Sequence, residues 1–554
     1  MMPAITVVLA TYNRADRLRA CLDALDRQTC PLDDYEVIVV DDGSSDRTRE
    51  LLESYRPRYR LRPMFQSNTG QPRALNRGVE SADTRYCLLL DDDIIAGPDL
   101  VREHLDAQRA SDSGRLAMGR LDIVVPSDAD WFVRAFARGW ERRHRRLDGG
   151  TAEPTIADCY SGNLSFPRAA FMAVGGFAAE FARGYDIELA FRLLGTGLRL
   201  AYLPGAAASQ DERKRGRDLI RDDERAGASA WKIYQRTPAL LDHLGLGEFE
   251  SQGPITAMAR RALLASNLPP AWLLRVGRGQ RWARFVRRYA FWRGVRAAVG
   301  DGDTWERLTT GVSILMYHAI GRDGEPGSRY ILPVREFAWQ LRWLRRNGYS
   351  ILSLAEYLRC RVERRLPPAR SVVLTFDDGY MDNADLAQPL LAAAECSATI
   401  FLVTDLLGTG NSWDRAGALV GRPLMSWGDA ARLEGKALSF GPHSRTHRPM
   451  RGCDAETLRG EIGGSWAAVV QHLRDPVPVF AFPFGAHDDA ACDEVEGVGL
   501  AAALTVRPGR NGPAAPLMRL RRLEVRGDEG RTHFRMLLRT GTDRWRRRQG
   551  TRRG

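Results

Sequence analysis

Short runs of hydrophobic residues alternate with amphipathic stretches in the first half of the chain. The runs Ile5–Ala10, Tyr35–Val40 and Tyr86–Leu90 predict buried strands, because each is rich in apolar and β-branched residues and is bounded by polar ones. Between the first two, apolar residues recur at helical spacing over residues 18–25. This alternation predicts a parallel sheet covered by helices, with functional side chains at the carboxyl ends of the strands.

The second half shows the same alternation, beginning with the predicted strand Ser313–Tyr317. Repeated strand–helix units from residue 313 to about residue 527 predict a distorted (β/α) barrel, whose site lies at the strand carboxyl ends. A chain of 554 residues is too long for one hydrophobic core. We therefore expect an α/β protein with four parts, namely residues 1–211, a helical connector at 212–310, a second catalytic domain at 311–530 and a basic tail at 531–554.

Two acidic clusters stand at predicted strand ends in the first half. The strand Tyr35–Val40 runs into Asp41-Asp42-Gly43-Ser44-Ser45-Asp46, and Tyr86–Leu90 runs into Asp91-Asp92-Asp93. A carboxylate at such an end can hold a divalent cation that bridges two phosphates and stabilises a nucleoside diphosphate as it leaves. Because acidic turns are common at strand ends, an Asp-x-Asp alone is a weak indication.

The order of these motifs resembles the family 2 glycosyltransferases of the GT-A fold over about residues 4–210. Thr11-Tyr12-Asn13-Arg14, the acidic turn, Asn68-x-Gly70, Asn76-x-Gly78 and Leu90–Asp93 carry the likeness. The resemblance implies that Asp93 holds Mg²⁺ or Mn²⁺. It also implies a nucleotide-sugar site with Tyr12 and Asp42 at the uracil end and Asp91 at the ribose–phosphate side; the nucleotide-binding set is Thr11, Tyr12, Asp42, Asp91 and Asp92.

A later segment, residues 184–193, is similar to the family's GEDxELxxRL helix start. An inverting transferase needs a base for the acceptor hydroxyl, and this resemblance assigns that role to Asp186. The alternative is an aspartate stabilised by the helix dipole. Two positions depart from the pattern: Tyr185 replaces the usual Glu, and Gln210 stands where many members carry a metal-binding His. The second departure predicts either a lower metal affinity or Asp211 as a substitute ligand. The chain lacks a QxxRW block, which argues against a processive synthase.

A second set of metal ligands occurs in the C-terminal half. The strand Val372–Phe376 ends at Asp377-Asp378-Gly379, and Gly441-Pro442-His443-Ser444-Arg445-Thr446-His447 follows later. One aspartate and two histidines four residues apart can bind one ion and leave positions open for water. With Phe480–Gly485, these blocks resemble polysaccharide deacetylases (family 4 carbohydrate esterases, NodB-like). The resemblance implies that Asp378, His443 and His447 hold Zn²⁺ or a similar divalent metal, and that Asp377 is the base.

Two features separate this half from the commoner deacetylase pattern. Many relatives place an arginine that orients the base two residues before the motif proline, where this chain has Ala481, and no Leu-x-His block occurs in residues 517–525. Both features match a subgroup similar to the poly-N-acetylglucosamine deacetylases, whose acid histidine lies in an early Met-Tyr-His block. His318 occupies that block and is the predicted general acid; a structural histidine at a strand end is the alternative.

Charge and composition suggest partners and a compartment. The net charge of +12 comes mainly from arginine and favours an anionic partner, unless it reflects only a GC-rich genome. Residues 281–296 alternate aromatic residues with arginines, which suits peripheral contact with an anionic membrane or a helix packed on a domain core. No nucleic-acid recognition module accompanies them. Eight scattered cysteines, no signal peptide and no long apolar run predict a cytoplasmic protein, peripheral at the inner membrane face.

Together these patterns predict a bifunctional enzyme. One domain would transfer a sugar, an N-acetylhexosamine, from a nucleotide-sugar such as a UDP-sugar to a glycan or lipid-linked acceptor, and the other would remove acetyl groups in cell-envelope polysaccharide biosynthesis. Two alternatives remain. The C-terminal domain is only a glycan-binding module, or the transferase half is a degenerate scaffold for a deacetylase, as Tyr185 and Gln210 hint.

Overall fold

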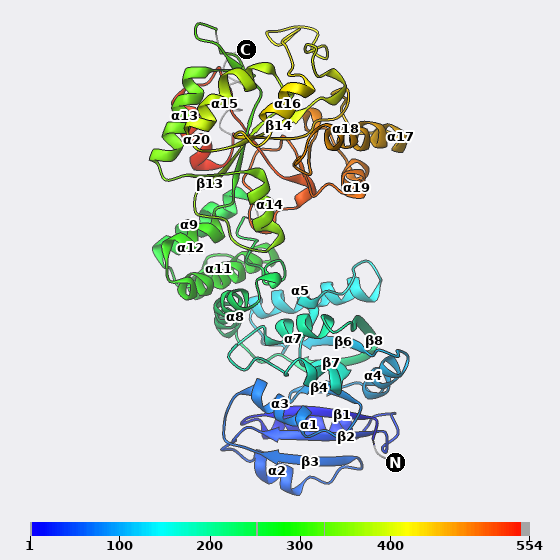
Figure 1. Ribbon diagram of the computed structural model, residues 1–554. Helices are drawn as coiled ribbons and strands as arrows, with labels where there is room; N and C mark the ends of the chain where they lie inside the picture. The colour runs from blue at the N-terminus through cyan, green and yellow to red at the C-terminus, as the bar shows by residue number, and fades with distance from the viewer. Residues whose placement is uncertain (1–2, 251–252, 326, 544–554) are drawn as a thin grey trace. The chain divides into compact units, whose positions relative to one another are not determined.

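The computed structural model describes residues 3–250, 253–325 and 327–543. The chain folds as two compact units. The first unit runs to Gly245 and resumes at Gly253–Gly300, and the second contains the chain from Asp301 onward with the short piece between them. Figure 1 labels the elements of both. The predicted α/β class is confirmed, and each unit has its own parallel strands and its own buried core.

The first unit is built on an eight-stranded sheet of order β3-β2-β1-β4-β7-β6-β8-β5. The first four strands in this order are parallel to one another, and β7 runs antiparallel to β4 and β6. Because β1 and β4 are neighbours, the motifs that follow them lie at one edge. The bounds are β1 Ile5–Thr11, β2 Tyr35–Asp41, β3 Arg60–Phe65, β4 Tyr86–Asp91, β5 Ile94–Ala96, β6 Arg115–Val124, β7 Asn163–Pro167 and β8 Arg199–Asp211.

Helices pack on this sheet through apolar faces and a few buried polar contacts. His104, on α4, is fully buried, and its two ring nitrogens lie 2.8 Å from Ser165 Oγ and 2.8 Å from Asn163 Oδ1 of β7. Burial lowers the pKa of His104 to about 4, so the ring is neutral at pH 7. The helices are α1 Ala15–Leu25, α2 Thr48–Ser54, α3 Gln71–Glu80, α4 Leu100–Arg109, α5 Trp131–Asp148, α6 Arg168–Ala173 and α7 Tyr185–Leu194.

Four further helices complete the first unit: α8 Gly216–Arg236, α9 Pro254–Ser266, α10 Leu273–Val276 and α11 Gln280–Val299. The backbones of α8 and α11 meet at two glycines. A Cβ on Gly227 would lie 1.9 Å from Phe291 O, and one on Gly294 would lie 1.9 Å from Glu224 O. The residues predicted as a separate connector therefore pack largely within the transferase-like unit, since only glycine allows this approach.

Helix α11 contains the aromatic and arginine residues that were predicted to face either a membrane or a core. Phe285, Val286, Tyr289 and Trp292 are buried within the first unit. Arg287 forms a bidentate ion pair with Asp223 of α8, at 2.8 and 2.9 Å. The aromatic face thus belongs to the core. None of the helices in the described part of the chain combines the length and apolar character needed to cross a bilayer.

The second unit contains a parallel sheet of order β15-β14-β13-β9-β18, with β12 paired to β13. A smaller pair, β16 and β17, continues it, because Val477 N donates to Phe440 O of β15 and Thr505 N donates to Leu520 O next to β18. The strands thus return to β9, as in the predicted distorted barrel. Their bounds are β9 Ser313–Tyr317, β10 Ala319–Gly321, β11 Ile331–Pro333, β12 Ser350–Leu352, β13 Ser371–Phe376, β14 Ala398–Leu402, β15 Leu438–Pro442, β16 Val479–Ala481, β17 Ala502–Leu504 and β18 Leu523–Glu524.

Helices surround these strands, and the last of them lies in the predicted tail. Phe534, Leu537 and Leu538 of α20 are buried in the same core as β13, so the chain is folded as far as this helix. The rest of the predicted basic tail, residues 544–554, lies outside the described residues. The helices are α12 Gly302–Thr309, α13 Val334–Arg346, α14 Leu354–Val362, α15 Gln388–Ala393, α16 Trp427–Leu433, α17 Ala455–Leu458, α18 Gly464–His472, α19 Asp489–Gly497 and α20 Arg531–Thr540.

Candidate active sites

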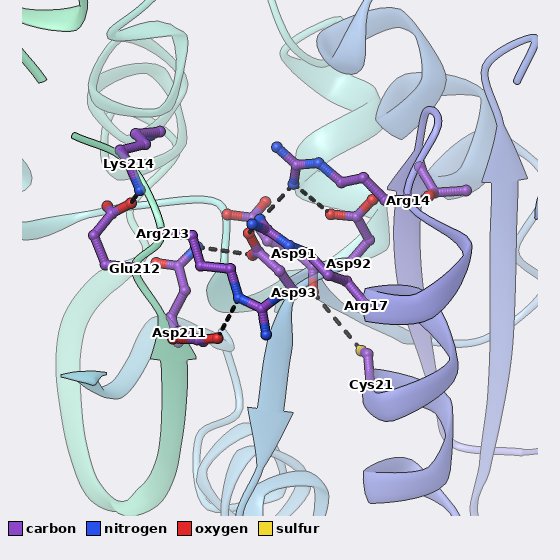
Figure 2. Close-up of polar contacts among 12 residues, drawn as sticks. Arg14, Arg17, Cys21, Asp91, Asp92, Asp93, Asp211, Glu212, Arg213 and Lys214 are labelled. Atoms are coloured by element: carbon purple, nitrogen blue, oxygen red, sulfur yellow. Dashed lines mark hydrogen bonds and ion pairs between the residues drawn. The ribbon is translucent and has the colours of Figure 1, made fainter. Parts of the chain in front are cut away.

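The acidic end of β4 meets the loop after β1 in the first unit. Thr11 Oγ1 donates to Asp92 Oδ2 at 2.7 Å, and the Arg14 guanidinium donates to Asp92 Oδ1 at 2.7 Å. Figure 2 shows the three aspartates between Arg14 and Arg17 on one side and the segment Asp211–Lys214 on the other. Asp92 is therefore a buried anchor for the β1 loop.

Asp93 faces this gap and is held from two sides. Its Oδ2 lies 3.3 Å from Arg14 and 3.1 Å from Arg17, and its Oδ1 accepts a 2.7 Å hydrogen bond from Gln210 of β8. Gln210 thus stands beside the predicted metal ligand, while Asp211 pairs with Arg213 at 2.6 Å. The Asp93 carboxylate is a hard oxygen donor, which fits Mg²⁺ or Mn²⁺, whereas Gln210 turns its amide nitrogen toward that carboxylate.

Asp91 is surrounded by groups that raise its proton affinity. Its Oδ1 accepts from Gln71 Nε2 at 2.9 Å, and Tyr185 OH donates to Gln71 Oε1 at 3.1 Å. Burial, reinforced by the charges of Asp93 and Asp92, raises the pKa of Asp91 to about 7. Gln71 therefore links Asp91 to Tyr185, the residue that replaces the usual Glu, by two hydrogen bonds.

Two other predicted nucleotide contacts and the predicted base lie in separate environments. Both carboxylate oxygens of buried Asp42 are occupied by loop 66–70, with bonds of 2.9 Å from Thr69 N and 2.8 Å from Gly70 N. The side chain of Tyr12 is 48% exposed. Asp186 begins α7, and burial raises its pKa above the ordinary value.

An open cleft of about 570 Å³ adjoins Asp91 and Asp93. Cationic side chains line it together with these two carboxylates. A diphosphate has two negative charges, which guanidinium and ammonium groups bind through charge-assisted hydrogen bonds. The cationic lining consists of Arg14, Arg17, Arg183, Lys214 and Arg225.

The second unit brings Asp378, His443 and His447 together at the ends of β13 and β15. Asp378 Oδ1 lies 3.4 Å from His443 Nε2 and 3.2 Å from His447 Nε2. All three side chains are buried. A zinc ion with bonds of about 2.0–2.1 Å holds tetrahedral ligand atoms about 3.3–3.4 Å apart. The donor set therefore fits one divalent ion of the Zn²⁺ kind.

The orientation of this set is fixed by backbone groups. His443 Nδ1 lies 2.7 Å from Ala481 O, and because a carbonyl only accepts, Nδ1 carries the proton and Nε2 is left for a metal. Asp378, Ser444, His447 and nearby Phe484 all have left-handed φ angles between 55° and 76°. Such angles are costly for residues other than glycine, and they cluster here at the predicted site.

Asp377 has a partner that the sequence pattern did not indicate. Arg522, just before β18, donates two hydrogen bonds to its carboxylate at 2.6 and 2.7 Å. Burial alone raises the pKa of Asp377, but the charge of Arg522 and its neighbours holds it below the ordinary value. Arg522 thus supplies a positive charge beside the predicted base, which Ala481 cannot. No local pattern in Leu520–Leu523 distinguishes buried Arg522 from exposed Arg521.

His318 stands beside Asp377 because β9 and β13 are parallel, with Tyr317 opposite Phe376. Its ring contacts that of Tyr330, with centroids 4.9 Å apart. Its buried Nδ1 has no hydrogen-bond partner among the described residues. His487, by contrast, is stacked on Phe482, and its Nδ1 lies 2.8 Å from Gly485 O. The register therefore places His318, the predicted acid, next to the predicted base.

Two separate segments of the chain match two different family models. Residues 6–175 match the model of the family described as Glycosyl transferase family 2, and residues 364–503 match that of Polysaccharide deacetylase.

Individual relatives follow the same division. The validoxylamine A glucosyltransferase of Streptomyces hygroscopicus subsp. jinggangensis (strain 5008) is 32% identical over 222 residues, which cover 36% of this chain and 53% of that protein. The chain thus spans about half the length of this relative. The putative polysaccharide deacetylase YxkH of Bacillus subtilis (strain 168) is 24% identical over 212 residues, covering 38% of this chain and 70% of that protein. The solved structure of Streptococcus pyogenes deacetylase PplD in complex with acetate superposes with a TM-score of 0.36 at 22% identity, covering 41% of this chain and 98% of that one.

Proposed function

We propose that this chain, which joins a family 2 glycosyltransferase domain to a polysaccharide deacetylase domain, is a bifunctional enzyme of glycan synthesis. It transfers a sugar from a nucleotide-sugar, for which we propose a UDP-linked N-acetylhexosamine, to a glycan or lipid-linked acceptor. It also hydrolyses N-acetyl groups on the sugar. The observation that carries the proposal is the buried triad of Asp378, His443 and His447 beside the Arg522–Asp377 pair, in a chain that also keeps an acidic cleft lined by cations.

In the transferase unit, the cleft residues divide the work of binding and proton transfer. Asp93 would hold Mg²⁺ or Mn²⁺, which supplies positive charge to the diphosphate when bound. Lys214 and Arg225 bind the phosphate oxygens directly, so that negative charge developing on the leaving group is met by fixed cations. Asp186 accepts the proton of the acceptor hydroxyl, and its raised pKa makes it a stronger base than a solvated aspartate.

In the deacetylase unit, Asp378, His443 and His447 would hold Zn²⁺, which polarises a water molecule and the amide oxygen when bound. Asp377 takes the proton of that water, and the two bonds from Arg522 keep its carboxylate ionised and oriented. His318 donates a proton to the nitrogen of the leaving amine. Linking the two activities in one chain raises the effective concentration of one site's product at the other.

The two alternatives make different predictions. If the C-terminal unit is a glycan-binding module, acetate release is absent; if the transferase unit is a degenerate scaffold, nucleotide release is absent. Tyr185 and Gln210 are the residues that favour the second alternative, since both depart from the family pattern beside the predicted metal site. Membrane contact through residues 281–296 stays a prediction. Phe285, Tyr289 and Trp292 are buried, so exposed arginines such as Arg281 and Arg284, with half-buried Trp282 and Phe291, remain for it.

The test measures UDP release and acetate release from one purified preparation. We expect Asp93→Ala to abolish UDP release and leave acetate release intact, and His443→Ala to do the reverse. A panel of nucleotide-sugars, with products weighed by mass spectrometry, identifies the donor. Loss of both activities in either variant, with the protein still folded, would contradict two independent sites.

A further inference from the structure

One stretch of the first unit carries basic residues without any acidic ones. Residues 251–300 contain ten arginines and no aspartate or glutamate, whereas the whole chain has a net charge of +12. Some of these arginines are neutralised by α8: Arg287 pairs with Asp223 at 2.8 Å, and Arg293 pairs with Glu224 at 2.6 Å. The remaining charge is therefore concentrated around α10 and the start of α11.

Four of the arginines are exposed, namely Arg275, Arg278, Arg281 and Arg284. Within the described residues, none of the four has a carboxylate within 4.0 Å. On α11, Arg281 and Arg284 are three residues apart and lie on the same side of the helix. These guanidinium groups are therefore solvated and free to meet an anionic partner.

Exposed apolar side chains lie among these arginines. Trp272 is 50% exposed and Val276 is 54% exposed, at the two ends of α10. Trp282 of α11 donates its indole N–H to Leu273 O at 2.9 Å and packs against Gly277, so α10 is held beside the first turn of α11. We call Trp272, Val276 and the four arginines the basic–apolar surface.

We propose that the basic–apolar surface docks the first unit on an anionic lipid membrane. Tryptophan and aliphatic side chains enter the interfacial layer of a bilayer, while arginines beside them bind the lipid phosphates. Duplex nucleic acid would use the arginines but would leave Val276 unburied, and no recognition module is present. This inference concerns residues outside both candidate active sites and does not depend on either activity. It moves the docking surface from the buried aromatic face of α11 to α10 and the exposed edge of α11.

The experiment is co-sedimentation of the full-length protein with phosphatidylcholine vesicles that contain 0% or about 30% phosphatidylglycerol, at about 0.1 M salt. We expect binding only to the anionic vesicles. Each arginine near such a surface changes binding about fivefold, so Arg281→Gln with Arg284→Gln weakens it about 30-fold. Trp272→Ser weakens binding to the same vesicles without changing the net charge. The matched control is Arg138→Gln with Arg142→Gln on α5, two exposed arginines of the same unit, which leaves binding within about threefold of wild type.

Three results would overturn the proposal. The first is wild-type protein that stays in the supernatant with anionic vesicles. The second is an equal loss of binding in the α5 control, which would show a diffuse charge effect. The third is tighter binding to duplex DNA than to vesicles, with Trp272→Ser unaffected. UDP and acetate release from soluble substrates are measured in parallel, and unchanged values in the surface variants separate docking from catalysis.

Discussion

Replacing Arg522 by glutamine tests how the deacetylase base is kept ionised. Asp377 and Arg522 have side chains that are 4% and 0% exposed, joined by bonds of 2.6 and 2.7 Å. Removing one member of a buried pair leaves an uncompensated charge, which costs about 3–5 kcal/mol. The ionised carboxylate would lose that stabilisation, so the pKa of Asp377 rises from its lowered value.

The direction of the pH effect follows from that shift. In the wild type, the pKa of Asp377 is lower in the folded state than in the unfolded state, where it is about 3.9. The ion pair therefore stabilises the fold at pH values above 3.9, and this stabilisation is lost as the pH falls through the folded-state pKa. In Arg522→Gln the raised pKa reverses the sign, and the variant is least stable where the carboxyl is ionised. We expect the acid limb of acetate release to move to higher pH, because a protonated base accepts no proton.

The assay is a pH–rate profile of acetate release, paired with urea unfolding of each variant at pH 5 and pH 8. Arg521→Gln is the matched control, since this neighbouring arginine is exposed and leaves Asp377 untouched. Arg522→Lys keeps the charge without the bidentate geometry and is expected to restore part of the acid limb. An Arg522→Gln enzyme whose acid limb and stability equal those of Arg521→Gln would refute the reasoning.

Three further predictions concern other side chains. His318→Ala lowers kcat for acetate release about 10²–10⁴-fold and keeps its bound metal by metal analysis; near-normal turnover, or metal loss, rules out the acid role. Gln210→His adds an imidazole beside Asp93 and lowers the Mn²⁺ concentration for half-maximal UDP release about tenfold; an unchanged concentration shows that position 210 does not contact the ion. His104 is neutral in the folded state, and the unfolded ring binds a proton with a pKa of about 6.5, so the free energy of unfolding of the first unit falls by about 3 kcal/mol between pH 7 and pH 4. Unfolding measured against pH for His104→Gln lacks this contribution, and the same pH dependence in both proteins contradicts the prediction.

The strands that carry both sites were predictable because buried parallel strands consist of nearly continuous hydrophobic residues. β1, β4 and β13 are such runs, and the carboxylates after them are where the pattern changes. His318 follows β9 directly, as the Met-Tyr-His block indicated, and its role as the acid stays a prediction. Local pattern was sufficient wherever strand and functional residue are adjacent in the sequence.

Other features depend on contacts between distant segments. Arg522 is 145 residues from Asp377, and its inward direction is set by the pairing of β18 with β9, which no local pattern specifies. The face of α11 was equally ambiguous, since aromatic residues at helical spacing fit a membrane or a core. The choice was decided by α8, which supplies Asp223 to Arg287 and a glycine where the two backbones touch.

The glycine contact between α8 and α11 also determines which fragment of the chain can be expressed on its own. A fragment ending at Asp211 would leave α5 without the helices that pack on it, and Phe136 without the guanidinium of Arg287 that lies 4.9 Å from its ring centroid. A version of the first unit that is expressed alone or fused to another protein must therefore include the residues up to Gly300. The segment that folds as one unit is therefore longer than the segment that carries the motifs, because Gly227 and Gly294 allow α8 and α11 to pack together.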